Sequence, residues 1–196
     1  MSVLTPTNIS FILQGLWLTI YISFIAIVLS TLIGTVLAVM RNGKNPILRW
    51  ISSIYIEFVR NVPNLLWIFI IFLIFQMKST PAGITAFTVF TSAALAEIIR
   101  GGLNGVDDGQ TEAGLAQGMT KFTDFHLHLF FHKHSVKCCQ LSFSQFVTVI
   151  KDTSLLYSVI AIQELFGKSQ ILMGRYFEAN QVFYTICFDC CHLLCD

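Results

Sequence analysis

The stretch LQGLWLTIYISFIAIVLSTLIGTVLAVM, residues 13–40, decides the fold of this chain. It contains no Asp, Glu, Lys or Arg along its whole length. About 20 predominantly apolar residues in a helix are enough to cross the hydrocarbon core of a bilayer. The stretch therefore predicts a membrane-spanning helix.

The composition of the whole chain agrees with a membrane protein. Of its 196 residues, 55% are hydrophobic and 12% are charged, whereas soluble domains carry about 25% charged residues. Further apolar segments occupy residues 62–77, 83–99, 143–162 and the stretch from Val182 onward. We expect an all-α polytopic membrane protein in which residues 1–196 form one transmembrane domain of about five helices, the last of them truncated.

The sequence disfavours a nucleic-acid-binding protein, and it disfavours a secretory signal peptide at the N-terminus. The net charge is +1 and no basic stripe is present, so nothing indicates a nucleic-acid partner. Residues 1–12 carry no Lys or Arg, and the apolar run that follows them is too long for the core of a secretory signal peptide.

The positions of Lys and Arg predict the orientation, because cytoplasmic loops are enriched in these residues. The connection after the first span contains four of them, and the next connection contains only Lys78. The four are Arg41, Lys44, Arg49 and Arg60. We therefore expect the N-terminus outside the cell and the loop that follows Arg100 in the cytoplasm.

That cytoplasmic loop contains a short helix candidate, GQTEAGLAQGMT, at residues 109–120. Asp107 and Asp108 precede it and suit a helix start, while Gly118 suits the position that ends a helix. Small residues between them leave a face that fits a shallow cleft on a partner protein. An ordinary amphipathic helix lying at the membrane surface is the alternative interpretation of this segment alone.

Three separated motifs resemble those of one transporter family. AEIIRGGLNGVDDGQTEAGLAQGM, residues 96–119, resembles the EAA loop and the preceding helix of type I ABC importer permeases. IYIEFVRNVPNLLWIFIIF resembles the YVEFFRGTPLLVQ segment of the polar amino acid uptake family, with Glu57, Arg60 and Pro63 at matching places. QFVTVIKDTSLLYSVIAIQEL resembles that family's QFI-LIKDTSLLSVIGV-EL stretch. The resemblance covers nearly all of residues 13–187, with one gap.

The resemblance implies a transport subunit of the cell membrane rather than an enzyme, with no cofactor. Residues Gln110 to Gly118 would form the coupling helix, in which Glu112, Ala113 and Gly118 occupy the motif positions. The implied partners are a dimer of ATP-binding subunits, a second permease subunit, an extracellular or lipid-anchored amino-acid-binding protein, and membrane lipids. ATP would bind to its own subunits, because this chain has no Gly-rich phosphate loop. The expected cargo at the level of the family is glutamine or glutamate.

Charged residues inside a bilayer are costly and are therefore functional candidates. Lys151, Asp152, Thr153 and Ser154 lie within an otherwise apolar segment and are candidates for the translocation path or gate. In the structural alternative, Lys151 reaches the membrane surface or pairs with Glu97, and Asp152 caps a helix break.

Five other residues are expected to have structural roles. Glu97 and Arg100 have the (i, i+3) spacing of a helical ion pair. Glu57, Arg60 and Pro63 belong to the matching motif, and Arg60 suits an anchor at the membrane surface. An ion-coupled carrier is the alternative function, but such carriers usually contain internal repeats, and none is found in this sequence.

Every His and Cys lies in one of two windows, residues 126–139 and 187–196. Their spacing does not form a regular set of metal ligands, so no metal site is assigned. A shift of the reading frame by one base converts suitable codons for HKHSVKCCQLSF into PQAFRKMLPAIV, close to the PQALRRMLPA segment of the family. A shift by one base in the opposite direction converts suitable codons for DCCHLLCD into IAVIYCV. We predict that residues 123–143 and 188–196 are out of frame; a chain made as written would be a defective permease.

Overall fold

The structure is a computed structural model that describes residues 5–104, 116–118 and 133–176. Within these ranges the regular elements are all helices. They are α1 (Pro6–Asn42), α2 (Pro46–Asn61), α3 (Asn64–Phe75), α4 (Ser79–Asn104), α7 (Lys133–Asp152), α8 (Ser154–Ile160) and α9 (Leu165–Tyr176). The expected all-α fold is confirmed.

Local sequence accounts for where the first helices begin. The hydroxyl of Thr5 accepts a hydrogen bond from the amide of Asn8 at 3.4 Å, and Pro6 opens α1. In the same way Asn45 accepts from the amide of Ile47 at 3.0 Å at the start of α2. A polar cap followed by proline is a favourable helix start, because the cap satisfies a free amide and proline has none to satisfy.

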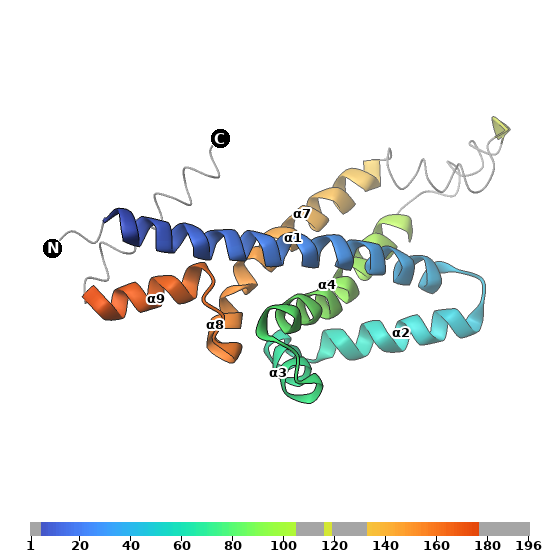
Figure 1. The fold of residues 1–196 in the computed structure, drawn as a ribbon. Coiled ribbons are helices and arrows are strands. Elements are labelled where there is room, and N and C mark those ends of the chain that lie inside the picture. Colours follow the sequence, from blue (N-terminus) through green and yellow to red (C-terminus); the bar gives the residue numbers. More distant parts are fainter. Residues whose placement is uncertain (1–4, 105–115, 119–132, 177–196) are drawn as a thin grey trace.

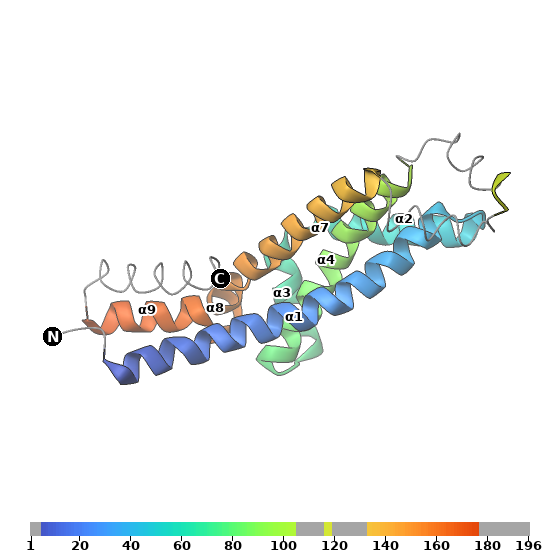
Figure 2. The same ribbon diagram turned by 90° about the horizontal axis from the view of Figure 1, so that it is seen from above.

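The long helix α1 organises the molecule (Figure 1). α2 and α4 pack against its C-terminal part and α9 lies along its N-terminal part, an arrangement that the view from above also shows (Figure 2). α1 and α4 make the most extensive contact. Their approach is close at Gly34, where an added Cβ would lie 3.0 Å from the carbonyl oxygen of Ser92. The main core combines apolar side chains from α1, α2, α3, α4, α7 and α8, among them Ile22, Phe87 and Leu156.

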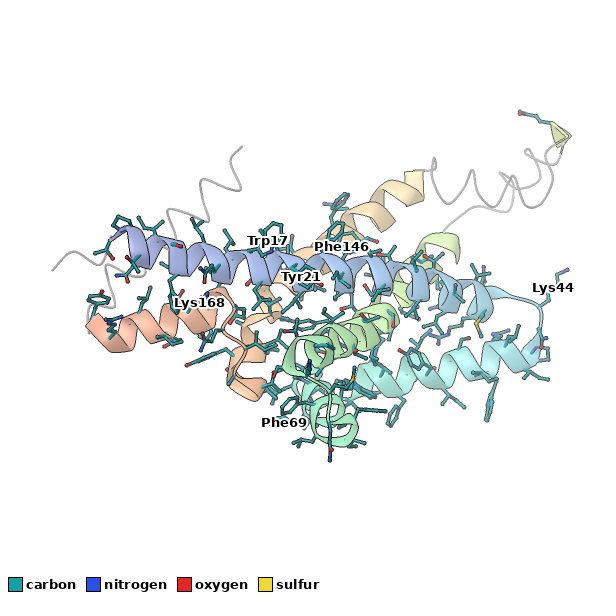
Figure 3. The ribbon with its side chains drawn as sticks, in the orientation of Figure 1. Trp17, Tyr21, Lys44, Phe69, Phe146 and Lys168 are labelled. Carbon is teal, nitrogen blue, oxygen red and sulfur yellow. The ribbon has the colours of Figure 1, made fainter. Side chains whose placement is uncertain are left out.

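The outer surface of the helices is apolar. Large side chains such as Trp17, Phe24 and Leu32 on α1 are more than half exposed. Trp17 and Tyr21, both labelled on α1 in Figure 3, are 71% and 46% exposed. Apolar side chains that face outward are what a helix surrounded by lipid or by a partner subunit requires.

Two single helices are long and apolar enough to cross a membrane: α1, and α4 as far as Gly102. Two pairs meet the same test only together. α2 and α3 are bent by 103° at their junction, and residues 140–160 and α9 are bent by 59°. The described residues thus contain two spans, or up to four if each bent pair is one span. The fifth predicted span, from Val182, lies outside the described residues.

One predicted span forms a shorter helix in the structure than expected. We expected a single helix over residues 62–77, but α3 covers only its 12 residues. At 1.5 Å per residue this is about 18 Å, less than the roughly 30 Å of a hydrocarbon core. Val62 has an extended ψ of 130° before Pro63, as expected for a residue that precedes proline. Proline also lacks an amide hydrogen, and the helix path turns at this point.

Candidate functional site

The break between α2 and α3 lies beside the point in the second bent pair where α7 ends and α8 begins. α2 and α3 are interrupted at Val62 and Pro63, and α7 and α8 are interrupted at Thr153. The side-chain amide of Asn64, at the start of α3, donates to the carboxylate of Asp152 at 3.3 Å. A single polar contact therefore joins segments 88 positions apart in the sequence.

Side-chain hydroxyls stabilise the backbone at the break between α7 and α8. Thr153 is buried and donates to the carbonyl of Ile150 at 2.7 Å, and Ser154 donates to the carbonyl of Lys151 at 2.9 Å. Hydroxyl groups that bond to a preceding carbonyl compete with regular helix bonds and commonly bend a helix. Two such bonds follow each other at Thr153 and Ser154, and the interruption is slight because Thr153 keeps helical dihedral angles (φ −56°, ψ −26°).

A cavity of about 300 Å³ lies beside this break. Its walls come from α1, from α7 and α8, and from α9 with the residue before it. The lining residues are Leu16, Thr19, Ile20, Ile150, Lys151, Thr153, Ser154, Glu164, Leu165, Phe166 and Ser169. Three of the four predicted path residues line the cavity, while Asp152 contacts α3.

Glu164 is a buried carboxylate in the wall of this cavity, with 1% of its surface exposed. Its oxygens accept from the amides of Phe166 at 2.8 Å and Gly167 at 2.9 Å, and from the hydroxyl of Thr19 at 3.4 Å. Glu164 therefore caps α9 and joins it to α1. We did not single it out from the sequence, although a lone carboxylate in the apolar stretch IAIQELF was a sufficient signal.

Two further polar contacts continue along the same helix pair. The ammonium group of Lys168 donates to Gln14 at 3.0 Å and lies 4.4 Å from the centre of the Phe11 ring. Figure 3 shows Lys168 between α9 and α1. The side-chain amide of Asn8 donates to the hydroxyl of Tyr176 at 3.0 Å. Polar contacts at several points along its length thus hold α9 to the N-terminal half of α1.

An ionic cluster joins the opposite end of α1 to α2 and α4. The carboxylate of Glu97 contacts Arg41 and Arg100, both at 2.6 Å. Arg41 also contacts Glu57 at 3.2 Å, and the Glu57 side chain is 66% exposed. The sequence indicated the Glu97–Arg100 spacing but not the role of Arg41, which we used only to predict orientation.

The structural alternative for Lys151, an ion pair with Glu97, is not what the structure shows. Glu97 is occupied by Arg41 and Arg100, and Lys151 is exposed with no ion pair to any described residue. Arg60 is also exposed, near the end of α2.

Most of the predicted coupling helix lies outside the described residues. Gln110, Glu112 and Ala113 are among the positions that the structure does not describe. Gly118 has a φ of +85°, in the left-handed region that favours glycine, and follows helical Ala116 and the turn residue Gln117. Of the predicted out-of-frame windows, only residues 133–143 are described, as part of α7.

Comparison with known proteins gives a match over most of the chain. Residues 30–187 match the family described as the binding-protein-dependent transport system inner membrane component. The probable glutamine ABC transporter permease protein GlnP of Bacillus subtilis (strain 168) is 35% identical over 181 residues, which are 90% of this chain and 82% of that protein. The glutamate/aspartate import permease protein GltK of Escherichia coli O6:H1 is 31% identical, covering 86% of this chain and 80% of that protein.

A third relative and a solved structure agree. The L-cystine transport system permease protein TcyB of Bacillus subtilis (strain 168) is 32% identical, over 89% of this chain and 79% of that protein. A chain in the crystal structure of an amino acid ABC transporter with histidines superimposes with a TM-score of 0.76 at 25% identity. That match covers 92% of this chain and 86% of the other.

These matches confirm the predicted relation to the permeases of ABC importers and the location in a membrane. They extend across both bent helix pairs and therefore include the point where the two breaks meet. The chain belongs to the family of binding-protein-dependent transport system inner membrane components.

Proposed function

We propose that this chain is a permease subunit of an ATP-driven importer for polar amino acids. The relatives are named for glutamine, for glutamate or aspartate, and for L-cystine. These compounds share an α-amino group, an α-carboxylate and a further polar group. Glutamine or glutamate is the specific cargo that we propose.

The observation that carries this proposal is the meeting of two helix breaks within the bundle. Non-helical backbone at membrane depth is tolerated where protein surrounds it or where it lines a cavity, and transporters place substrate sites at such breaks. Here a cavity of about 300 Å³ borders the interruption at Thr153, and its lining residues include Lys151 and Glu164. Glu164 itself lies in the non-helical segment between α8 and α9.

Each polar residue at the break has a proposed role. The ammonium group of Lys151 offers a positive charge for a substrate carboxylate, and the hydroxyls of Thr153 and Ser154 offer further polar contacts. Asp152 bonds to Asn64 across the two breaks, so a shift of either broken helix alters this contact. Residues 151–154 together form the proposed translocation path or gate.

ATP-driven movement would reach this gate through the cytoplasmic loop. We propose that Gln110, Glu112, Ala113 and Gly118 belong to a coupling helix that docks on an ATP-binding subunit. Two permease subunits, identical or related, would enclose the pathway, and a binding protein outside the cell would deliver the amino acid. Closure of the ATP-binding subunits would then switch the permease pair between inward-facing and outward-facing states.

The source of energy tests the proposal against an ion-coupled carrier. Uptake of radiolabelled glutamine or glutamate is measured in cells that express the complete transporter. Depletion of ATP with the ion gradients maintained should stop uptake, whereas collapse of the gradients with ATP maintained should leave it. The reverse pattern would identify an ion-coupled carrier instead.

Co-purification tests the coupling helix. Glu112→Arg and Gly118→Arg should each remove the ATP-binding subunit from the purified complex, because a bulky cation would enter the docking face. Gly174→Arg is the matched control, since an added Cβ at Gly174 in α9 meets no atom within 4 Å. An intact complex with Glu112→Arg and Gly118→Arg would show that the docking surface lies elsewhere.

A further inference from the structure

A second cavity lies at the turn that joins α1 to α2. Its volume is about 330 Å³, and its walls come from the turn and the first two turns of α2. The lining residues are Gly43, Lys44, Pro46, Arg49, Trp50 and Ser53. Two of these six residues are cationic and none is acidic.

Neither cation in this cavity is neutralised by the described residues. Lys44 and Arg49 are exposed, and the ion pairs of the described part of the chain involve only Arg41 and Arg100 as cations. Figure 3 shows the Lys44 side chain at the turn, directed away from the helices. The cavity also lies at the N-terminal end of α2, which carries a partial positive charge. The cavity therefore favours an anion.

The three faces of α2 show what kind of anion fits. At 100° per residue, Ser52, Ile56 and Val59 form one face of the helix, and all three are buried. Pro46, Arg49 and Ser53 form a second face, which lines the cavity.

The third face of α2 is apolar and exposed. It carries Ile47, Trp50, Ile51, Ile54 and Phe58, whose exposed fractions range from 47% to 68%. Trp50 lies between this stripe and the cavity and belongs to both. A cationic cavity next to an exposed apolar stripe is complementary to a molecule with an anionic head and hydrocarbon chains.

We propose that this cavity binds the phosphate headgroup of an anionic phospholipid of the cytoplasmic leaflet, with its acyl chains along the apolar stripe of α2. The predicted orientation places this turn on the cytoplasmic side, where Lys and Arg accumulate. Tryptophan is enriched at the level of lipid headgroups, and basic pockets between helices on the cytoplasmic side bind acidic headgroups. The lipid would stabilise the junction of α1 and α2 beside the ionic cluster of Arg41 and Glu97.

Native mass spectrometry of the purified, delipidated transporter tests this proposal. Phosphatidylglycerol is added to the protein in detergent, with phosphatidylcholine of the same acyl chains and sodium phosphate as separate comparisons. We expect one tightly bound phosphatidylglycerol per copy of this chain, with weaker binding of phosphatidylcholine and of inorganic phosphate. Because each cation near an acidic membrane surface contributes about a fivefold factor, Lys44→Gln/Arg49→Gln should weaken binding roughly 30-fold.

Two further variants separate a lost site from a misfolded protein. Ser53→Glu keeps both cations but puts a negative charge into the cavity, and it should also weaken binding of phosphatidylglycerol. Lys78→Gln is the matched control, because Lys78 is exposed in the connection on the predicted opposite side of the membrane, and it should leave this binding unchanged. All variants are compared at equal recovery of monodisperse protein.

Three results would overturn the proposal. Equal binding of the two lipids, or unchanged binding of phosphatidylglycerol by the double variant, would show that the cavity is not a headgroup site. Binding of inorganic phosphate as tight as that of the lipid would identify a site for the free anion. Loss of the ATP-binding subunit from the double variant, with lipid binding intact, would identify the cavity as a protein contact.

Discussion

At the scale of single residues, Glu97 stands out because its carboxylate forms ion pairs with two arginines. Its two carboxylate oxygens bind guanidinium groups from two different helices, Arg41 of α1 and Arg100 of α4. The Arg100 contact follows from (i, i+3) spacing and was predictable. The Arg41 contact joins residues 56 positions apart, and nothing in a sequence pattern specifies such a pair.

Replacing Glu97 tests how much this ionic cluster contributes to the stability of the protein. Glu97→Gln keeps the size of the side chain but leaves the guanidinium group of Arg100 without its counter-charge, and Arg41 with only the exposed Glu57. We expect a loss of about 1–3 kcal/mol in stability, because hydrogen bonds to charged groups are the strong ones. Thermal unfolding of the purified protein in detergent measures this. Glu57→Gln is the control and should change stability by less than about 0.5 kcal/mol, since exposed pairs contribute little.

Asp152 tests the proposed gate at the same scale. Asp152→Asn preserves an acceptor for Asn64 and removes the charge, so the helices should still pack. We expect uptake by the intact transporter to fall roughly 10-fold to 100-fold, the value of one interaction with a charged group. The complex should still co-purify with its ATP-binding subunit. Ser158→Ala, at an exposed position of α8, is the matched control, and normal uptake by Asp152→Asn would exclude this carboxylate from the gate.

At the scale of helices, the close approach of α1 to α4 depends on a missing side chain. An added Cβ at Gly34 would lie 3.0 Å from the Ser92 carbonyl oxygen and 3.1 Å from the Leu95 Cβ. Small residues permit such approaches between membrane helices. α4 contributes its own small residues, including Ser92 and Ala93, which are fully buried.

Gly34→Ala should therefore destabilise the helix pair. We expect a cost of about 1–3 kcal/mol, as for other insertions into packed contacts. Gly101→Ala is the matched control, because no atom lies within 4 Å of a Cβ added there. At this helical position alanine should be neutral or stabilising by up to about 1 kcal/mol. Equal melting temperatures for the two variants would contradict the close packing.

The helices themselves were largely predictable, but their interruptions were less so. Long apolar runs predicted α1 and α4 because apolar length is a direct requirement of the bilayer. The break at Pro63 coincides with the start of the predicted span 62–77, whereas the helix before it, α2, was not predicted. The break at Thr153 was visible as polar residues in an apolar segment, but its contact with Asn64 required the structure.

At the scale of the whole molecule, family motifs predicted the class of protein and the all-α membrane fold. Only some of the residues that line the cavity beside Thr153 could be predicted from the sequence. Residues 151–154 stood out by their polarity, whereas Thr19 and Glu164 come from helices that only tertiary packing brings together. Pairings between distant helices leave no local signal in one sequence.

The reading-frame hypothesis also concerns the whole molecule. We predict that resequencing the gene will show small insertions or deletions near the codons for Thr123, Ser142 and Phe188. The corrected chain should contain a PQAFRKMLPA-like segment before Gln145. An uninterrupted frame that encodes the His and Cys residues as written would refute the hypothesis.

The length of α1 has a mechanical consequence. Its 37 residues form one unbroken helix, about 55 Å long at 1.5 Å per residue. Arg41 ties one end to α2 and α4, and Glu164 and Lys168 fasten α9 near the other. Because α1 is this long, a change of about 5° in its tilt at the Arg41 end would displace its far end by about 5 Å. A small rotation at the Arg41 end would thereby displace α9 at the far end of α1.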